Sequence, residues 1–173
     1  SFDFNTKKEP FTLDGVSFIN DSIQDKISLL KGQDSQQLIT PQVVPQNFDS
    51  YFGLSIADYK ALENQFKKYI RHLNIPLNKI SFDILSSVDE ISWVQLQENQ
   101  TVIFHINNTE IINSQLFSIS NYQGNFRGIN LYAQEFNKDL KILLNTLGSF
   151  SGAKWSTQLD DFLVYSNSES HLK

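Results

Sequence analysis

Two apolar runs in the middle of the chain constrain its fold more than any other feature. Residues 91–96 and 101–106 are strand-like, and the four polar residues 97–100 separate them. Two such runs joined by a short polar stretch are typical of a β-hairpin. The segment therefore predicts an antiparallel strand pair.

The alternation of side chains in this hairpin predicts a core face and a mixed face. A turn at the centre of the polar stretch would place Trp93 opposite Phe104 and Ser92 opposite His105. Because side chains alternate along a strand, one face is then almost entirely apolar. That face carries Ile91, Trp93, Gln95, Val102, Phe104 and Ile106. His105 falls on the other face, and we expect it to be a polar neighbour of Ser92 and not a base held by a carboxylate.

An apolar stripe at helical spacing predicts that residues 55–73 form the longest helix. Ser55 is a suitable N-cap, and Asp58 lies in the first turn, where negative charge is favourable. The stripe consists of Ile56, Tyr59, Leu62, Phe66, Tyr69, Ile70 and Leu73. We expect this stripe to pack on the sheet, with Phe66 in the core.

The other elements are shorter, and together they predict an α+β domain. One helix is expected from residue 21 or 22 to Gly32 and another from Asn137 to Gly148. Strands are expected at 38–44, where Pro41 indicates an edge position, at 129–136 and at 162–165. This pattern predicts a mostly antiparallel sheet with about three packed helices. Residues 1–10 are expected to be a tail or linker, and residues 11–173 a single domain excised from a longer chain.

Charge and residue content exclude several classes of protein. The net charge is −5, and the only arginines are Arg71 and Arg127, so a nucleic-acid partner is not expected. The chain has no cysteine, which excludes disulfides and cysteine metal sites. No apolar stretch is long enough to span a membrane. We expect no cofactor and no metal.

The ionisable residues do not form a recognisable catalytic pattern. Only His72, His105 and His171 could serve as a histidine base, and no serine lies in a G-x-S-x-G turn. The adjacent pair Asp160 and Asp161 would point to opposite faces of a strand. We therefore expect that the protein is not an enzyme.

The surface is expected to be rich in amides and hydroxyls, since the chain contains 16 Asn, 14 Gln and 20 Ser. Such surfaces suit contact with sugars or proteins. Tyr51, Tyr122, Phe126 and Tyr132 lie in or near polar segments, so they are the residues predicted to make surface contacts. Residues 124–128 predict a mobile surface loop.

Three segments, residues 88–93, 102–108 and 159–169, carry a resemblance to a known group of proteins. In strand pattern and amide content, residues 11–173 resemble modules of the uncharacterised exported lipoproteins of Bacteroidetes. The resemblance implies export to the periplasm or cell surface, with any lipid anchor carried by a part of the chain outside this sequence. It implies no functional residues.

These observations lead to two hypotheses of function. The first is a non-catalytic module of an exported cell-envelope protein, with a structural or protein-interaction role. The alternative is a carbohydrate-binding module or a cryptic glycoside hydrolase, which would need an exposed aromatic platform and, for hydrolysis, paired carboxylates.

Overall fold

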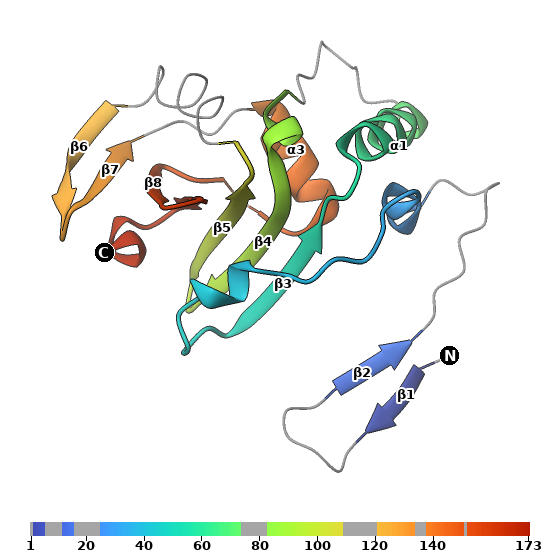
Figure 1. Ribbon diagram of the computed structural model, residues 1–173, viewed down its shortest axis with the longest axis horizontal. Coiled ribbons are helices and arrows are strands. Elements are labelled where there is room, and N and C mark those ends of the chain that lie inside the picture. Colours follow the sequence, from blue (N-terminus) through green and yellow to red (C-terminus); the bar gives the residue numbers. More distant parts are fainter. Residues whose placement is uncertain are drawn as a thin grey trace.

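The computed structural model describes residues 2–5, 12–15, 25–73, 83–108, 121–133, 138–150 and 152–173. Within these ranges, nine strands form two antiparallel sheets (Figure 1). The smaller sheet pairs β1 (Phe2–Asn5) with β2 (Thr12–Gly15). The larger sheet has the strand order β3-β4-β5-β9-β8-β7-β6. Its strands are β3 (Ser50–Ser55), β4 (Val88–Leu96), β5 (Asn99–Ile106), β6 (Asn121–Phe126), β7 (Ile129–Ala133), β8 (Trp155–Leu159) and β9 (Phe162–Ser166).

The prediction of an α+β domain with about three packed helices is wrong, because the fold is dominated by its sheet. The described ranges contain two α-helices, α1 (Tyr59–His72) and α3 (Lys138–Leu147). In the helix expected before Gly32, the described part is only a five-residue 3₁₀ helix, η1 (Lys26–Leu30). Of its three apolar residues Leu29 is buried in the core, but Ile27 and Leu30 are exposed, so only one apolar side chain of this segment is buried to stabilise a helix.

The longest described helix is α1, but it begins four residues later than predicted. Its N-cap is Asp58, whose carboxylate accepts hydrogen bonds from the backbone N–H of Lys60 (2.9 Å) and Ala61 (3.0 Å). Ser55 instead ends β3. The capping interaction fits Asp58 because its side chain satisfies two of the N–H groups that a helix leaves unpaired.

One side of the large sheet, the helix face, packs against α1 and α3. The predicted core face of the hairpin is confirmed: Ile91, Trp93, Val102, Phe104 and Ile106 are all buried. They pack in one core with Leu163 and Tyr165 of β9, Leu62, Phe66 and Ile70 of α1, and Leu140, Leu143 and Leu144 of α3. Burial raises the pKa of the Tyr165 phenol above its ordinary value of 10.0.

The opposite side, the loop face, is covered by a loop and two short 3₁₀ helices. Residues 33–48 run across it and contain η2 (Thr40–Gln42), and η4 (Glu169–Leu172) contacts β8 and β9. Figure 1 shows η2, in cyan, in front of the sheet and α3 behind it. The predicted strand at 38–44 is therefore wrong. The apolar residues of this segment belong to a loop that packs on the face of the sheet, and the segment does not pair with any described strand.

The central hairpin has the predicted faces but a different register. Leu96 pairs with Asn99, so residues 97 and 98 form the turn, and Gln97 has a φ of 55°. Trp93 consequently faces Val102, and Ser92 faces Ile103. The shift is two residues in total, and an even shift returns each side chain to its predicted face.

Candidate functional site

A buried carboxylate holds the loop of residues 33–48, the loop layer, on the sheet. Glu90 of β4 is 3% exposed and accepts hydrogen bonds from the backbone N–H of Ile39 (2.6 Å) and of Thr40 (3.2 Å). The Thr40 hydroxyl also bonds to Glu90, and Ser92 Oγ donates to it at 3.2 Å. Tyr51 OH completes the cluster, 2.9 Å from both the Thr40 and the Ser92 hydroxyls. Since the polar groups of this cluster are hydrogen-bonded to one another, the cluster attaches the loop to the sheet, and we call it the Glu90 anchor; it is not an open binding site.

Beside this anchor, the loop layer leaves an apolar pocket of about 130 Å³, the loop-face pocket. Its floor lies over the middle of the sheet, and Val164 of the central strand β9 is only half-buried there. The loop layer therefore covers this part of the sheet incompletely. The lining residues are Val43, Pro45, Val94, Leu96, Thr101, Ile103, Ile129, Thr157, Leu159, Val164, His171 and Leu172.

The lining of the loop-face pocket contains three side chains that can form hydrogen bonds. Thr101 Oγ1 donates to Ser166 Oγ (3.3 Å), and Thr157 Oγ1 donates to the carbonyl of Asn130 (2.8 Å). The third is His171 of η4, whose Nδ1 is buried and has no hydrogen-bond partner among the described residues. Its other ring nitrogen, Nε2, lies 3.4 Å from the amide nitrogen of Asn99.

The outer edge of the sheet at β3 presents a second feature that can bind a partner. Ile56 N–H donates to the carbonyl of Asp89 (2.7 Å), which places the even-numbered residues of β3 in the ladder with β4. The backbone groups of Tyr51, Gly53 and Ser55 therefore point away from β4. No backbone hydrogen bond joins them to another described segment.

Exposed aromatic side chains and a shallow hollow accompany this edge. Phe52 is 48% exposed and Phe48 is 42% exposed. The Phe52 ring lies 5.2 Å from the ring of Trp93, which is buried and whose Nε1 has no described partner. A hollow of about 360 Å³ adjoins them, lined by residues of β3, β4 and β5 and by Leu147, Gly148 and Ser149.

The prediction for the environment of His105 is wrong. His105 lies opposite Glu90 and not Ser92, and its Nδ1 is 2.5 Å from the carboxylate of Asp89. A register irregularity between Val88 and Glu90 lets Asp89 reach the ring. The Phe162 ring packs against it at 5.1 Å. His105 and Asp89 thus form a histidine–carboxylate pair at the end of β5, with no nucleophilic side chain bonded to it among the described residues.

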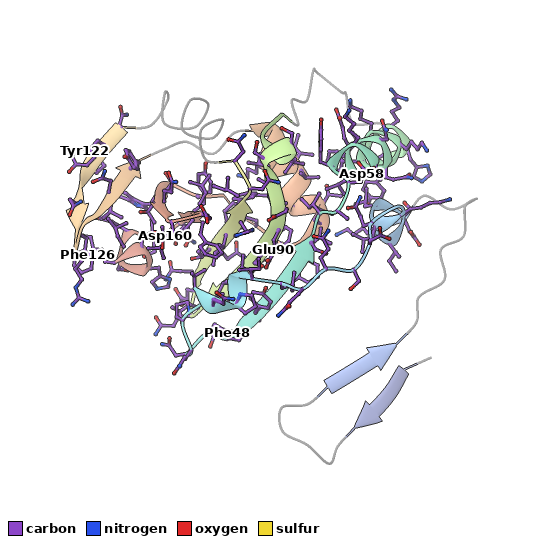
Figure 2. The ribbon with its side chains drawn as sticks, viewed as in Figure 1. Phe48, Asp58, Glu90, Tyr122, Phe126 and Asp160 are labelled. Carbon is purple, nitrogen blue, oxygen red and sulfur yellow. The ribbon has the colours of Figure 1, made fainter. Side chains whose placement is uncertain are left out.

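The four aromatic residues predicted to make surface contacts lie in two places. Tyr51 belongs to the Glu90 anchor, whereas the other three lie on the β6–β7 hairpin. Figure 2 shows two of them, Tyr122 and Phe126, on β6. Tyr122 is 60% exposed and its ring is 6.0 Å from that of its cross-strand neighbour Tyr132. Phe126 ends β6 beside the Arg127–Gly128 turn, so the segment predicted as a mobile loop is a hairpin.

A second hollow, of about 560 Å³, adjoins this hairpin. It is lined by Gly128, Ile129, Asn130, Tyr132, Gln158, Leu159 and Asp160. The amide of Asn125 donates to Asn130 Oδ1 (2.9 Å), which places two amide side chains next to the hollow. One carboxylate, Asp160, is part of the lining.

The described parts of the chain contain neither a candidate metal-binding cluster nor a candidate membrane-spanning helix. No group of three or more His, Cys, Asp or Glu side chains there could hold a metal ion. No helix in these ranges is long and apolar enough to cross a membrane. In comparisons with known proteins, no family model, no curated protein and no solved structure matches the chain.

Sequence reasoning missed both the open edge and the pocket. The segment 50–55 contains no charged residue and no proline, which is a signal of an unprotected strand, but the helical stripe places its last residue, Ser55, at the start of the helix. The pocket joins residues from seven separate elements or loops, and no local pattern marks such a set.

Proposed function

We propose that this chain is a non-catalytic interaction module that binds an extended segment of a partner protein along the open edge of β3. The observation that carries the proposal is the backbone of Tyr51, Gly53 and Ser55, which has no backbone hydrogen-bond partner among the described residues. An added strand would satisfy these N–H and C=O groups, as in other cases of β-strand addition.

The composition of β3 supports this proposal. Proteins usually protect an edge strand with charged residues, proline or a bulge. The sequence of β3, Ser-Tyr-Phe-Gly-Leu-Ser, contains no charge and no proline, and its pairing with β4 is regular. Phe52 and Phe48 add exposed apolar area next to the edge, where aromatic side chains often anchor a bound partner.

Peptide selection tests the proposal. We would select peptides from a random display library against the chain and measure backbone hydrogen exchange in the complexes. Selected peptides are expected to slow exchange at Tyr51, Gly53 and Ser55. A peptide N-methylated at the residues whose N–H groups face β3 should lose binding, whereas methylation at the intervening residues should have little effect.

Two matched variants distinguish binding at the β3 edge from nonspecific hydrophobic binding. Phe52→Lys places a charge on the edge and should abolish binding of the selected peptides, while Tyr122→Lys changes an even more exposed aromatic residue elsewhere and should not. Selected peptides that bind Phe52→Lys as well as the parent chain, or that protect none of the three amides, would refute strand addition.

One observation favours carbohydrate binding as a second candidate. The exposed Tyr122, its neighbour Tyr132 and the amides of Asn125, Asn130 and Gln158 lie together at the β6–β7 end of the sheet. Aromatic faces and amides suit sugar rings. Among the described residues that line the hollow, Asp160 is the one acid, which supports binding over hydrolysis, since hydrolysis needs two carboxylates. A glycan array with reproducible hits that Tyr122→Ala removes would favour this candidate over the first.

The proposed setting is the cell envelope of a bacterium, with the module outside the cytoplasm. The support is the resemblance to exported lipoproteins described above. Fractionation of cells that express the natural full-length protein tests the setting, and recovery in the cytosolic fraction would overturn it.

A further inference from the structure

The outward side of α1 is basic, although the chain as a whole carries a net charge of −5. Helical spacing places six polar residues, none of them acidic, on the side opposite the buried stripe: Lys60, Asn64, Lys67, Lys68, Arg71 and His72. Lys60, Lys68 and Arg71 are exposed and have no acidic partner among the described residues, while Lys67 is paired with Glu63 at the margin of this side. The helix dipole does not explain Lys60, because a positive charge in the first turn of a helix is unfavourable.

The 3₁₀ helix η1 presents two exposed aliphatic side chains beside α1. η1 contacts α1, and Figure 1 shows it in blue next to that helix. Leu29 is buried in the core and fixes the inner side of η1, whereas Ile27 and Leu30 are exposed. Because residues three apart lie above one another in a 3₁₀ helix, Ile27 and Leu30 form one apolar pair. Lys26 and Lys31, both exposed, flank this pair in the sequence.

The basic side and the apolar pair meet along one flank of α1. A Cβ at Gly32, two residues after Leu30, would lie 3.4 Å from the Cβ of Ala61. Ala61 and Lys68 are seven residues apart, about two helical turns, so they share this flank. The exposed side chains of η1 and the basic side of α1 therefore form one continuous area, the α1–η1 surface.

The chemistry of the α1–η1 surface fits an anionic lipid bilayer better than a segment of a protein. None of the hollows described above is lined by residues of α1 or η1, and a bound helix or strand needs a groove or an open edge. Protein interfaces usually depend on aromatic anchors, whereas the exposed apolar residues of η1 are aliphatic. Aliphatic side chains can enter the acyl boundary of a bilayer while neighbouring lysines contact the anionic headgroups.

We propose that the α1–η1 surface docks the protein on an anionic lipid bilayer. Ile27 and Leu30 enter the headgroup boundary, and Lys60, Lys68 and Arg71 contact the phosphates of anionic lipids. The protein then lies on the membrane surface without crossing it. The α1–η1 surface does not include β3, so membrane docking and partner binding at the β3 edge are independent of each other.

Sedimentation with lipid vesicles tests the docking. One set of vesicles contains phosphatidylglycerol and phosphatidylcholine in equal parts, and the other contains phosphatidylcholine alone. We expect the chain to sediment with the anionic vesicles and to stay in solution with the neutral ones. Added salt should weaken the binding, because it screens the charges of the exposed side chains.

Two variants of equal net charge identify the surface. Lys60→Gln, Lys68→Gln and Arg71→Gln, made together, should lower the partition constant on the anionic vesicles about a hundredfold, which corresponds to about fivefold for each charge. The matched control removes three exposed cations elsewhere, through Lys141→Gln, Lys154→Gln and Arg127→Gln. The control should keep the partition constant within about twofold of that of the parent chain, since charges far from the bilayer are screened.

A second pair of variants tests the apolar contribution. Ile27→Ser and Leu30→Ser, made together, should lower the partition constant about tenfold, because less apolar area enters the bilayer. Ile39→Ser changes a side chain of comparable exposure on the loop face and should have no effect. All substituted side chains are exposed, so each variant should unfold at the same urea concentration as the parent chain.

Docking on a bilayer is refuted if the chain binds neither kind of vesicle or binds both kinds equally. It is also refuted if the control cations matter as much as those of α1, or if the serine variant of η1 keeps the full partition constant. Soluble polyglutamate is the last probe. Binding of polyglutamate through Lys60, Lys68 and Arg71, without binding to anionic vesicles, would overturn the proposal and assign the surface to an acidic protein partner.

Discussion

Replacing Glu90 by alanine tests how the loop layer is held on the sheet. The backbone N–H groups of Ile39 and Thr40 would lose their acceptor, while the hydroxyls of Thr40, Tyr51 and Ser92 keep one another as partners. An unsatisfied buried donor costs about 1–3 kcal/mol, and only the Thr40 N–H is fully buried, so we expect a loss of about 1–3 kcal/mol of unfolding free energy. Local detachment of residues 33–48 would relieve the penalty by exposing both N–H groups to water.

Urea unfolding measures the total loss, and native-state hydrogen exchange at Ile39 and Thr40 measures the local opening. Glu98→Ala is the matched control, because Glu98 is exposed in the hairpin turn and should change stability by less than about 0.5 kcal/mol. Glu90→Gln retains one acceptor oxygen and should lose less than the alanine variant. A loss below about 1 kcal/mol for Glu90→Ala, with exchange at both amides unchanged, would refute the anchoring role.

Three further predictions concern the helix face. Phe66→Ala removes a fully buried ring and should lower the unfolding free energy in urea by about 3–5 kcal/mol; a loss under about 0.5 kcal/mol would contradict its place in the core. Gly148→Ala would bring a Cβ to 2.9 Å from Trp93 Cε2, so we expect a loss of about 1–3 kcal/mol and altered tryptophan fluorescence, and an unchanged melting temperature and spectrum would contradict the contact. Because folding raises the pKa of Tyr165, its neutral form contributes stability that is intact below the unfolded value of 10.0 and is lost as the pH rises above it; the wild-type unfolding free energy should fall more steeply there than that of Tyr165→Phe, by about 1.4 kcal/mol per pH unit, and equal slopes would argue against the burial effect.

A helix with a clear apolar stripe could be predicted from the sequence. Its first residue could not, because more than one nearby residue can act as the N-cap. The apolar stripe correctly predicted the buried face of α1, which carries Leu62, Phe66 and Ile70. Ser55 and Asp58 are both good N-caps, and the pairing of Ser55 with Glu90 in the sheet decided between them. That pairing is a tertiary contact, which a local pattern does not contain.

The hairpin shows which part of a strand pair a sequence can specify. Burial of Trp93 and Phe104 on the same face fixes the faces of both strands, because a shift by one residue would expose one of the two rings. A shift by two residues preserves the faces, so only the turn residues can select the register. The actual turn uses Gln97 with a positive φ, which is uncommon for a residue other than glycine, asparagine or aspartate, and the sequence offers no signal for it.

The candidate sites were harder to predict because they depend on strand order. The β3 edge is open only because β3 is the first strand of the sheet, and strand order cannot be derived from the alternation of one segment. The loop-face pocket likewise forms where the loop layer, η4 and five strands meet.

The position of β9 in the sheet has a consequence for how the chain is assembled. β9 is the central strand of the large sheet, yet it is the last strand in the sequence, and its pairing with β5 joins residues as far apart as Thr101 and Ser166. Until the ribosome releases β9, the hairpin β4–β5 has an exposed edge at β5, and β6–β7–β8 has no strand to connect it to that hairpin. Contacts of such long separation form slowly. The newly made chain therefore passes through a stage with more unpaired strand edges than the complete sheet, and such a stage is prone to aggregation until β9 is inserted.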